Sequence, residues 1–137
     1  MDNIIVRQKL DALARCINRI GEKCPENLEE LLNSYDLQDI ISINLERAIQ
    51  QSVDAAMIIL SDLDKPVPST MAEAFIELRE GNIISAETEK NMIKAVGFRN
   101  VAVHAYKKID WAIVWSIITK HIQDFKNYAQ EIINSGY

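Results

Sequence analysis

Side chains that could act together on a phosphate occur within ten residues late in the chain, in the stretch "GFRNVAVHAY" at residues 97–106. Arg99 is followed by Asn100, and His104 is followed two residues later by Tyr106. Arginine is a permanent cation whose planar fork matches phosphate oxygens, and histidine transfers protons near neutral pH. These residue types suit phosphodiester cleavage in RNA, where the 2′-hydroxyl attacks the neighbouring phosphorus and no metal is required.

In this interpretation Arg99 stabilises the charged phosphorane, Asn100 orients the site or contacts the phosphate, and His104 is the general base or acid. The reaction needs both a base and an acid, so one such histidine per chain is not enough. A symmetric dimer that brings two copies of His104 to a shared cleft would supply both.

The spacing also constrains the geometry of the site. Five residues turn a straight α-helix by about 500°, so Arg99 and His104 would lie about 140° apart around its axis. The pair converges only if the helix ends near Val103 or if a second chain completes the site. An extended chain after the helix would place His104 and Tyr106 on the same side, because residues i and i+2 share a side in extended backbone.

Positive charge gathers around this stretch. Residues 90–109 include five cations and no acid, whereas the whole chain of 137 residues has a net charge of −5. Lys94, Lys107 and Lys108 are therefore candidate RNA contacts. The acidic total argues against a protein that coats nucleic acid through bulk electrostatics, and DNA is not an expected ligand. A short basic run can also be a solvated helix face or a docking surface for an acidic partner.

Other kinds of site find little support in the sequence. The four glycines lie too far apart for a phosphate-binding loop, and neither histidine has the Glu-x-x-His spacing of a di-iron bundle. Cys16 and Cys24 are too few for a disulfide framework or a four-ligand zinc site and are expected to be reduced. His121, with Asp124 three residues later, is interpreted as a structural or surface residue. No metal and no cofactor are expected.

The chain reads as one all-α domain over residues 1–137. Its composition, 48% hydrophobic and 26% charged, is typical of a globular protein. No apolar run approaches the ~20 residues of a membrane span, and the N-terminus does not resemble a secretory signal, so a cytoplasmic location is expected. No segment shows a sustained period of two or a hairpin signal.

Apolar periodicity predicts four main helices and two short ones, arranged as a four-helix bundle. The first helix carries an apolar stripe (Val6, Leu10, Leu13, Ile17 and Ile20) and is expected to end at Gly21. Short helices are predicted at residues 25–33 and 72–78, the second with Thr70 and Glu73 at capping-box spacing. The longest helix spans about residues 37–63, and its apolar face is wide enough to be covered on two sides. Ser85 and Asp110 are predicted N-caps of the last two helices, the second of which runs to about residue 133.

Taken together, "GFRNVAVHAY", the capped helix "SAETEKNMIKAV" before it and "KKIDWAIVWSII" after it resemble the HEPN superfamily, and within it the HepT-like toxins of type VII toxin–antitoxin systems. The likeness covers almost the whole chain. The family motif of Arg, a polar residue, a few positions, His, any residue and Tyr is met in full by Arg99, Asn100, His104 and Tyr106.

The resemblance implies a homodimeric helical bundle with the motif at the dimer cleft, and metal-independent endoribonuclease activity. It also implies a partner, a minimal nucleotidyltransferase antitoxin that neutralises the toxin by transferring AMP to the motif tyrosine, here Tyr106. The alternative is a non-catalytic helical module that recruits or regulates a nucleotidyltransferase, since superfamily members also serve as binding modules.

Overall fold

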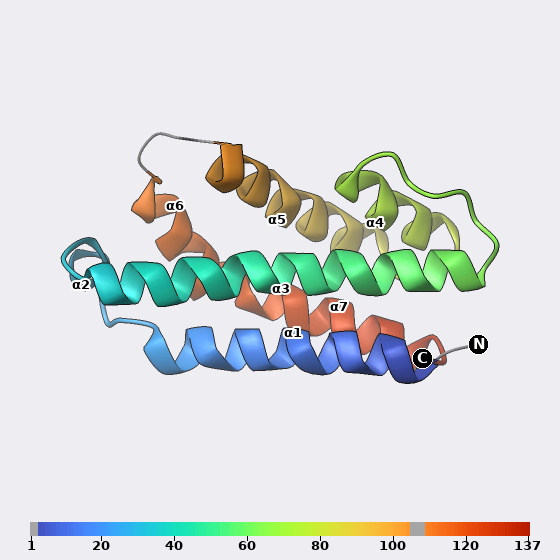
Figure 1. Ribbon diagram of the computed structural model, residues 1–137, viewed down its shortest axis with the longest axis horizontal. Helices are drawn as coiled ribbons and strands as arrows, with labels where there is room; N and C mark the ends of the chain where they lie inside the picture. Colours follow the sequence, from blue (N-terminus) through green and yellow to red (C-terminus); the bar gives the residue numbers. More distant parts are fainter. Residues whose placement is uncertain (1–2, 105–108) are drawn as a thin grey trace.

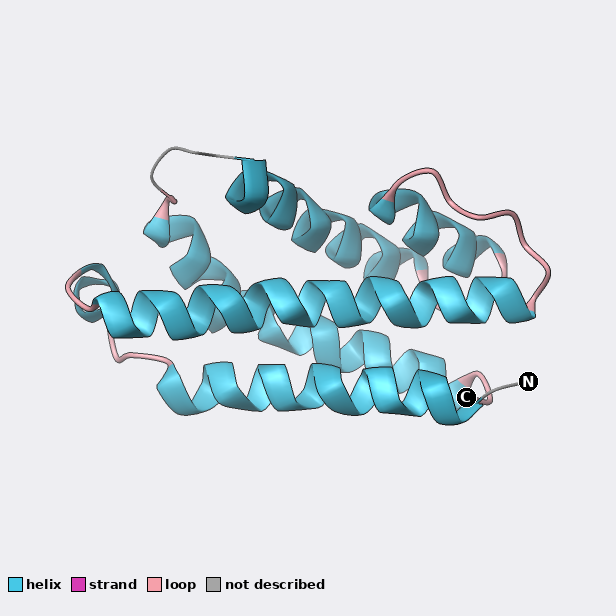
Figure 2. Ribbon diagram, viewed as in Figure 1, coloured by secondary structure: helices cyan, strands magenta, loops and turns pink. Residues whose placement is uncertain are grey.

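Helices make up almost all of the described chain. The computed structural model describes the backbone of residues 3–104 and 109–137, and the side chains of residues 4–99 and 109–137. Within these ranges the elements are α1 (Asn3–Lys23), α2 (Leu28–Leu32), α3 (Tyr35–Asp62), α4 (Met71–Glu80), α5 (Ala86–His104), α6 (Trp111–Ser116), the π-helical turn η1 (Ile117–His121) and α7 (Ile122–Asn134). No strand occurs in them, and Figure 2 shows helices joined by loops. The all-α prediction is confirmed.

The elements form a bundle around the long helix α3 (Figure 1). Helix α1 runs alongside α3, while α4 and α5 lie on the other side of it and α7 passes behind. Helix α5 packs against both α4 and α7, and α6 packs against α2. The four long rods are α1, α3, α5 and the continuous segment α6–η1–α7, which agrees with the four main helices expected from the periodicity.

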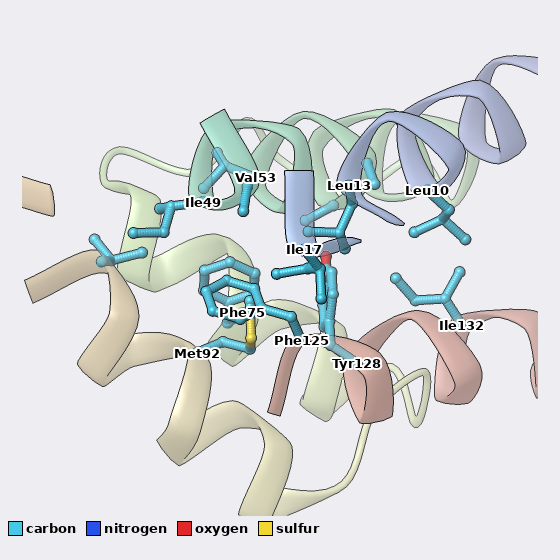
Figure 3. Close-up of a cluster of buried hydrophobic side chains, with 14 of the residues drawn as sticks. Leu10, Leu13, Ile17, Ile49, Val53, Phe75, Met92, Phe125, Tyr128 and Ile132 are labelled. Atoms are coloured by element: carbon cyan, nitrogen blue, oxygen red, sulfur yellow. The ribbon is translucent and has the colours of Figure 1, made fainter. Parts of the chain in front are cut away.

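The apolar stripes predicted from the sequence form the core. All five stripe residues of α1 are buried, with at most 5% of each side chain exposed. Helix α3 contributes a wide buried face that includes Leu45, Ile49 and Ile59. Figure 3 shows side chains from α1, α3, α4, α5 and α7 meeting in one cluster. The width of the α3 face therefore reflects contact on both sides, as predicted.

One polar group is built into this core. Tyr128 of α7 is fully buried, and its hydroxyl donates a hydrogen bond of 2.7 Å to the backbone carbonyl of Ser52 on α3. Its ring meets Phe75 edge to face, with the ring centroids 5.5 Å apart. Burial raises the pKa of Tyr128, so the hydroxyl stays protonated and keeps its donor role. The contact fixes α7 against α3 and α4.

The predicted helix caps are confirmed. The side chains of Thr70, Ser85 and Asp110 accept hydrogen bonds from the backbone N–H groups of Glu73, Thr88 and Ala112, at 3.1, 3.2 and 3.0 Å. These bonds satisfy donors that the first turn of a helix leaves without a partner.

Several element boundaries differ from the predictions. Helix α1 continues two residues past Gly21, and the predicted helix at residues 25–33 shrinks to α2, which starts after its cap Asn27. The last helix is interrupted by the π-helical turn η1, which the sequence analysis did not predict. The β-branched run at residues 117–119 has weak helix propensity, and the Thr119 hydroxyl donates to the carbonyl of Trp115 at 2.7 Å. These two features favour the wider turn.

The N-terminus of α5, the helix that carries the candidate residues, is fixed by a carboxylate from α7. Glu131 accepts hydrogen bonds from the backbone N–H of Ser85, at 2.6 Å, and from the hydroxyl of the buried Thr88. A negative charge at a helix N-terminus is stabilising because the aligned peptide dipoles place positive charge there. This contact joins α5 to α7 across 46 positions of sequence.

We expect Glu131→Ala to loosen the start of α5. Removal of both acceptor oxygens should lower the free energy of unfolding by about 1–2 kcal/mol, measured by urea denaturation. Amide hydrogen exchange should rise first around residues 85–89. The control is Gln130→Ala, which alters an exposed neighbour. Unchanged exchange at residues 85–89 would contradict the role of Glu131.

We also expect Tyr128→Phe to destabilise the core without changing the fold. The variant keeps the ring but loses the hydrogen bond to Ser52, at a cost of about 1 kcal/mol. Chemical denaturation checks this, with Tyr35→Phe as the matched control because 83% of Tyr35 is exposed. Equal losses in the two variants would show that the buried hydroxyl contributes nothing specific.

Candidate functional site

Arg99 is the motif residue whose side chain the structure describes. It is half-buried near the C-terminal end of α5, and its Nη1 lies 3.7 Å from the sulfur of Met71 at the start of α4. Its Nε is buried and has no hydrogen-bond partner among the described residues, where Arg99 also forms no salt bridge. Charged side chains are rarely buried without a partner, and half-buried Arg99 has no carboxylate partner among the described residues. The arrangement therefore suits a cation that binds a ligand anion.

Helix α5 ends close to the predicted position. Its last described residue is His104, one position after the predicted end near Val103. The positions of Arg99 and His104 thus share one continuous helix and lie about 140° apart around its axis. The convergence of the two side chains within one chain stays a prediction, because the side chain of His104 is not described. Both routes considered from the sequence, a helix end near Val103 and completion of the site by a second chain, are consistent with this helix.

The remaining motif residues fall outside the described part of the structure. Asn100 and His104 belong to α5, but their side chains are not described. Tyr106, Lys107 and Lys108 fall outside the described residues altogether, as does the extended exit predicted for residues 104–106 beyond its first residue. Their roles stay predictions.

A groove of about 630 Å³ lies between α5 and the segment α6–η1–α7. Lys94, the predicted RNA contact on α5, is exposed and lines it, as do Gly97 and Phe98 just before Arg99. On the facing wall are Ile113, half of whose surface is exposed, and His121. The groove therefore borders the same stretch of α5 that carries the candidate residues.

His121 is held by the partner that the sequence suggested. Its Nδ1 lies 3.1 Å from a carboxylate oxygen of Asp124, and the other oxygen of Asp124 accepts a hydrogen bond from Asn91 of α5 at 3.3 Å. All three residues line the groove. The sequence indicated the pair through its i,i+3 spacing, but the link to Asn91 and the position in the groove depend on how α5 packs against α7 and had no local signal.

The described residues offer no obvious metal centre. No three His, Cys, Asp or Glu side chains among them gather closely enough to hold an ion. Cys16 and Cys24 are both free and half-buried, and burial raises the pKa of each thiol. They are suited to packing rather than to nucleophilic chemistry, because the thiolate is the reactive form. Across the described helices, none is long and apolar enough to cross a membrane.

The chain is similar to proteins of known activity along nearly its whole length. One relative, from Shewanella oneidensis, is named mRNA nuclease HepT and is 29% identical over 130 residues, which cover 95% of this chain and 97% of the relative. Another, from Aphanizomenon flos-aquae, is named tRNA nuclease HepT and is 29% identical over 132 residues, covering 96% and 90%.

A solved structure agrees with this relationship. It contains the tri-AMPylated HEPN toxin of Shewanella oneidensis in complex with its MNT antitoxin, and matches the fold with a TM-score of 0.87 at 28% identity, covering 95% of this chain and 97% of that one. A family model described as "Ribonuclease HepT-like" matches residues 7–132. The resemblance expected from the motif is thus confirmed, and the chain belongs to the HepT-like ribonuclease family.

Proposed function

We propose that this protein is the endoribonuclease toxin of a toxin–antitoxin system and that it cleaves RNA without a metal ion at a cleft between two copies of the chain. The observation that carries the proposal is the half-buried Arg99, whose Nε has no partner among the described residues. Its place within the matched family region adds support, because the relatives are named mRNA and tRNA nucleases.

Arg99 would bind the scissile phosphate of the RNA. A guanidinium can donate two parallel hydrogen bonds to phosphate oxygens and stabilise the extra negative charge of the phosphorane. Asn100, the next residue on α5, would orient this contact or add one to the phosphate. Lys94 is exposed on the same helix and would attract the RNA backbone, together with Lys107 and Lys108.

His104 would transfer protons in the reaction. A base removes the proton of the 2′-hydroxyl as its oxygen attacks phosphorus, and an acid protonates the 5′-oxygen that leaves, which yields a 2′,3′-cyclic phosphate and a free 5′-hydroxyl. His104 sits about 140° from Arg99 on the helix. A homodimer that places two α5 helices across a cleft would let His104 of one copy face Arg99 of the other, and would provide both base and acid.

A nucleotidyltransferase antitoxin would neutralise this site. The related toxin of Shewanella oneidensis is AMPylated and bound to an MNT antitoxin. In this chain we propose Tyr106 as the acceptor, with its hydroxyl oxygen attacking the α-phosphorus of ATP and pyrophosphate leaving. The added phosphate would bring a negative charge and bulk to a position two residues after His104, where it would compete with RNA for Arg99.

The site of action would be the cytoplasm, where the RNA substrate and the antitoxin are made. DNA would not be cleaved because it lacks the 2′-hydroxyl nucleophile. The alternative function, a non-catalytic module that recruits or regulates a nucleotidyltransferase, predicts a stable complex with the antitoxin and no cleavage of any RNA.

We expect the purified protein to cleave RNA in the presence of a chelator and to lose at least about 10²-fold in kcat when His104 is changed to alanine, the usual scale for a positioned acid or base. Gel assays with RNA and with single-stranded DNA of the same sequence check this. The control variant is Gln123→Ala, an exposed change on α7. Equal rates for wild type and His104→Ala would remove His104 from the mechanism.

We expect AMP-sized mass additions on the protein after co-expression with its antitoxin, because Tyr106 is the proposed acceptor. Intact-mass spectrometry should show them on the wild type and on Tyr35→Phe, which alters an exposed tyrosine on α3. They should be absent from Tyr106→Phe. Additions that persist in Tyr106→Phe would place the modification elsewhere.

A further inference from the structure

We propose that the groove between α5 and α6–η1–α7 is a nucleotide subsite, which holds one base of the RNA strand next to the scissile phosphate. This inference rests on the proposed function and extends it to substrate recognition. It gives a role to His121, Asp124 and Asn91, which the cleavage chemistry does not use.

The groove has the size and lining of a small-ligand site. Its volume of about 630 Å³ falls within the ~300–1,000 Å³ typical of such sites. Apolar side chains form both walls (Met92, Ala95, Phe98, Ile113, Ile117 and Phe125). Proteins that bind single-stranded RNA commonly hold unstacked bases against aromatic and apolar side chains. A nucleobase, flat and apolar on its faces, fits this lining.

Polar groups in the groove are ordered in advance. Asp124 uses one carboxylate oxygen for Nδ1 of His121 and the other for the side-chain amide of Asn91. Nε2 of His121 forms no hydrogen bond within the described residues, so it is the ring nitrogen left to contact a base edge or a ribose hydroxyl. A network fixed before binding reduces the entropy lost when the ligand is ordered.

The distribution of charge indicates which part of a nucleotide enters. Lys94 lines the groove, and Lys90, one turn earlier on α5, is also exposed. The two lining carboxylates are occupied, since Asp110 caps α6 and Asp124 holds His121 and Asn91. The backbone phosphates would therefore lie along the lysine side of α5, and the neutral base would enter the groove.

Distance separates this subsite from the reaction centre. Asn91 precedes Arg99 by eight residues, which is about 12 Å along the helix axis. His121, held opposite Asn91, would thus serve a nucleotide beside the scissile phosphate rather than that phosphate. An apolar protein segment in the same place would bury Nε2 of His121 without a hydrogen-bond partner, which is unfavourable. RNA is the occupant that the polar groups favour.

The test uses the full chain carrying His104→Ala, with a short single-stranded RNA that contains 4-thiouridine. Ultraviolet cross-linking followed by peptide mass spectrometry should place the base on peptides that contain Phe98 or Ile113. Ala112→Trp adds a large side chain to an exposed position in the groove wall. It should weaken RNA binding by about tenfold or more, the scale of one lost stacked base, and abolish these cross-links.

Matched variants separate the groove from general effects. Ala14→Trp, on the exposed surface of α1, and Lys126→Ala, on the exposed surface of α7, should bind RNA as the parent does. Lys94→Ala and His121→Ala should each bind several-fold more weakly while their circular dichroism and dimer mass are unchanged. In the protein with His104 restored, His121→Ala should raise KM with little effect on kcat.

Several outcomes would overturn the subsite. Cross-links that map elsewhere, or that survive Ala112→Trp in a folded dimer, would exclude the base from the groove. Loss of the dimer in Ala112→Trp would assign the groove to contact between protein chains. Cleavage by the wild type decides the proposed function separately, because groove cross-links depend on binding and do not require the RNA to be cut.

Discussion

The need to bury α3 on both sides is the constraint on which the bundle depends. Its buried residues span an arc of about 160° around the helix axis, and they include Ala48, Ala55 and Ala56, whose small side chains let neighbouring backbones approach closely. One helix cannot cover so wide a face. Helix α1 takes one side and α4 with α5 the other, and α7 is tied to α3 by the Tyr128 hydroxyl. The position of α5 follows from this arrangement.

Helix α5 is fixed at its N-terminal end and carries the candidate catalytic residues at its C-terminal end. Two residues of α7 hold it: Glu131 binds its first turn, and Asp124 binds Asn91 in its middle. Near its last turn, Arg99 lies against α4. A rigid helix keeps the separation between the groove and Arg99 constant. The proposed subsite and the proposed reaction centre would then lie at a fixed spacing along α5, and the RNA strand would run along this helix.

The local features of the fold could be predicted from sequence because they depend on neighbours in the chain. The α1 stripe repeats at helical spacing, and the caps Ser85 and Asp110 stand directly before the helices that they cap. The choice of the motif residues rested on composition and on family likeness, and the family is confirmed. The positions of the side chains of Asn100 and His104 lie beyond what the structure describes.

The features that sequence did not indicate are those that depend on distant contacts. Nothing near Glu131 signals that its carboxylate meets Ser85, and the groove depends on how α5 packs against α6, η1 and α7.

The π-helical turn η1 determines the rotation of α7 about its axis, and therefore which residues of α7 face the core. Such a turn accommodates one residue more than an α-helical turn, and one residue corresponds to about 100° of rotation. If a related chain lacked that residue, α7 would start rotated, and Tyr128 and Glu131 would both face away from α3 and α5. The number of residues in the segment 117–121 is therefore more tightly constrained than their identities. Relatives in this family would tolerate substitutions in this segment but not deletions.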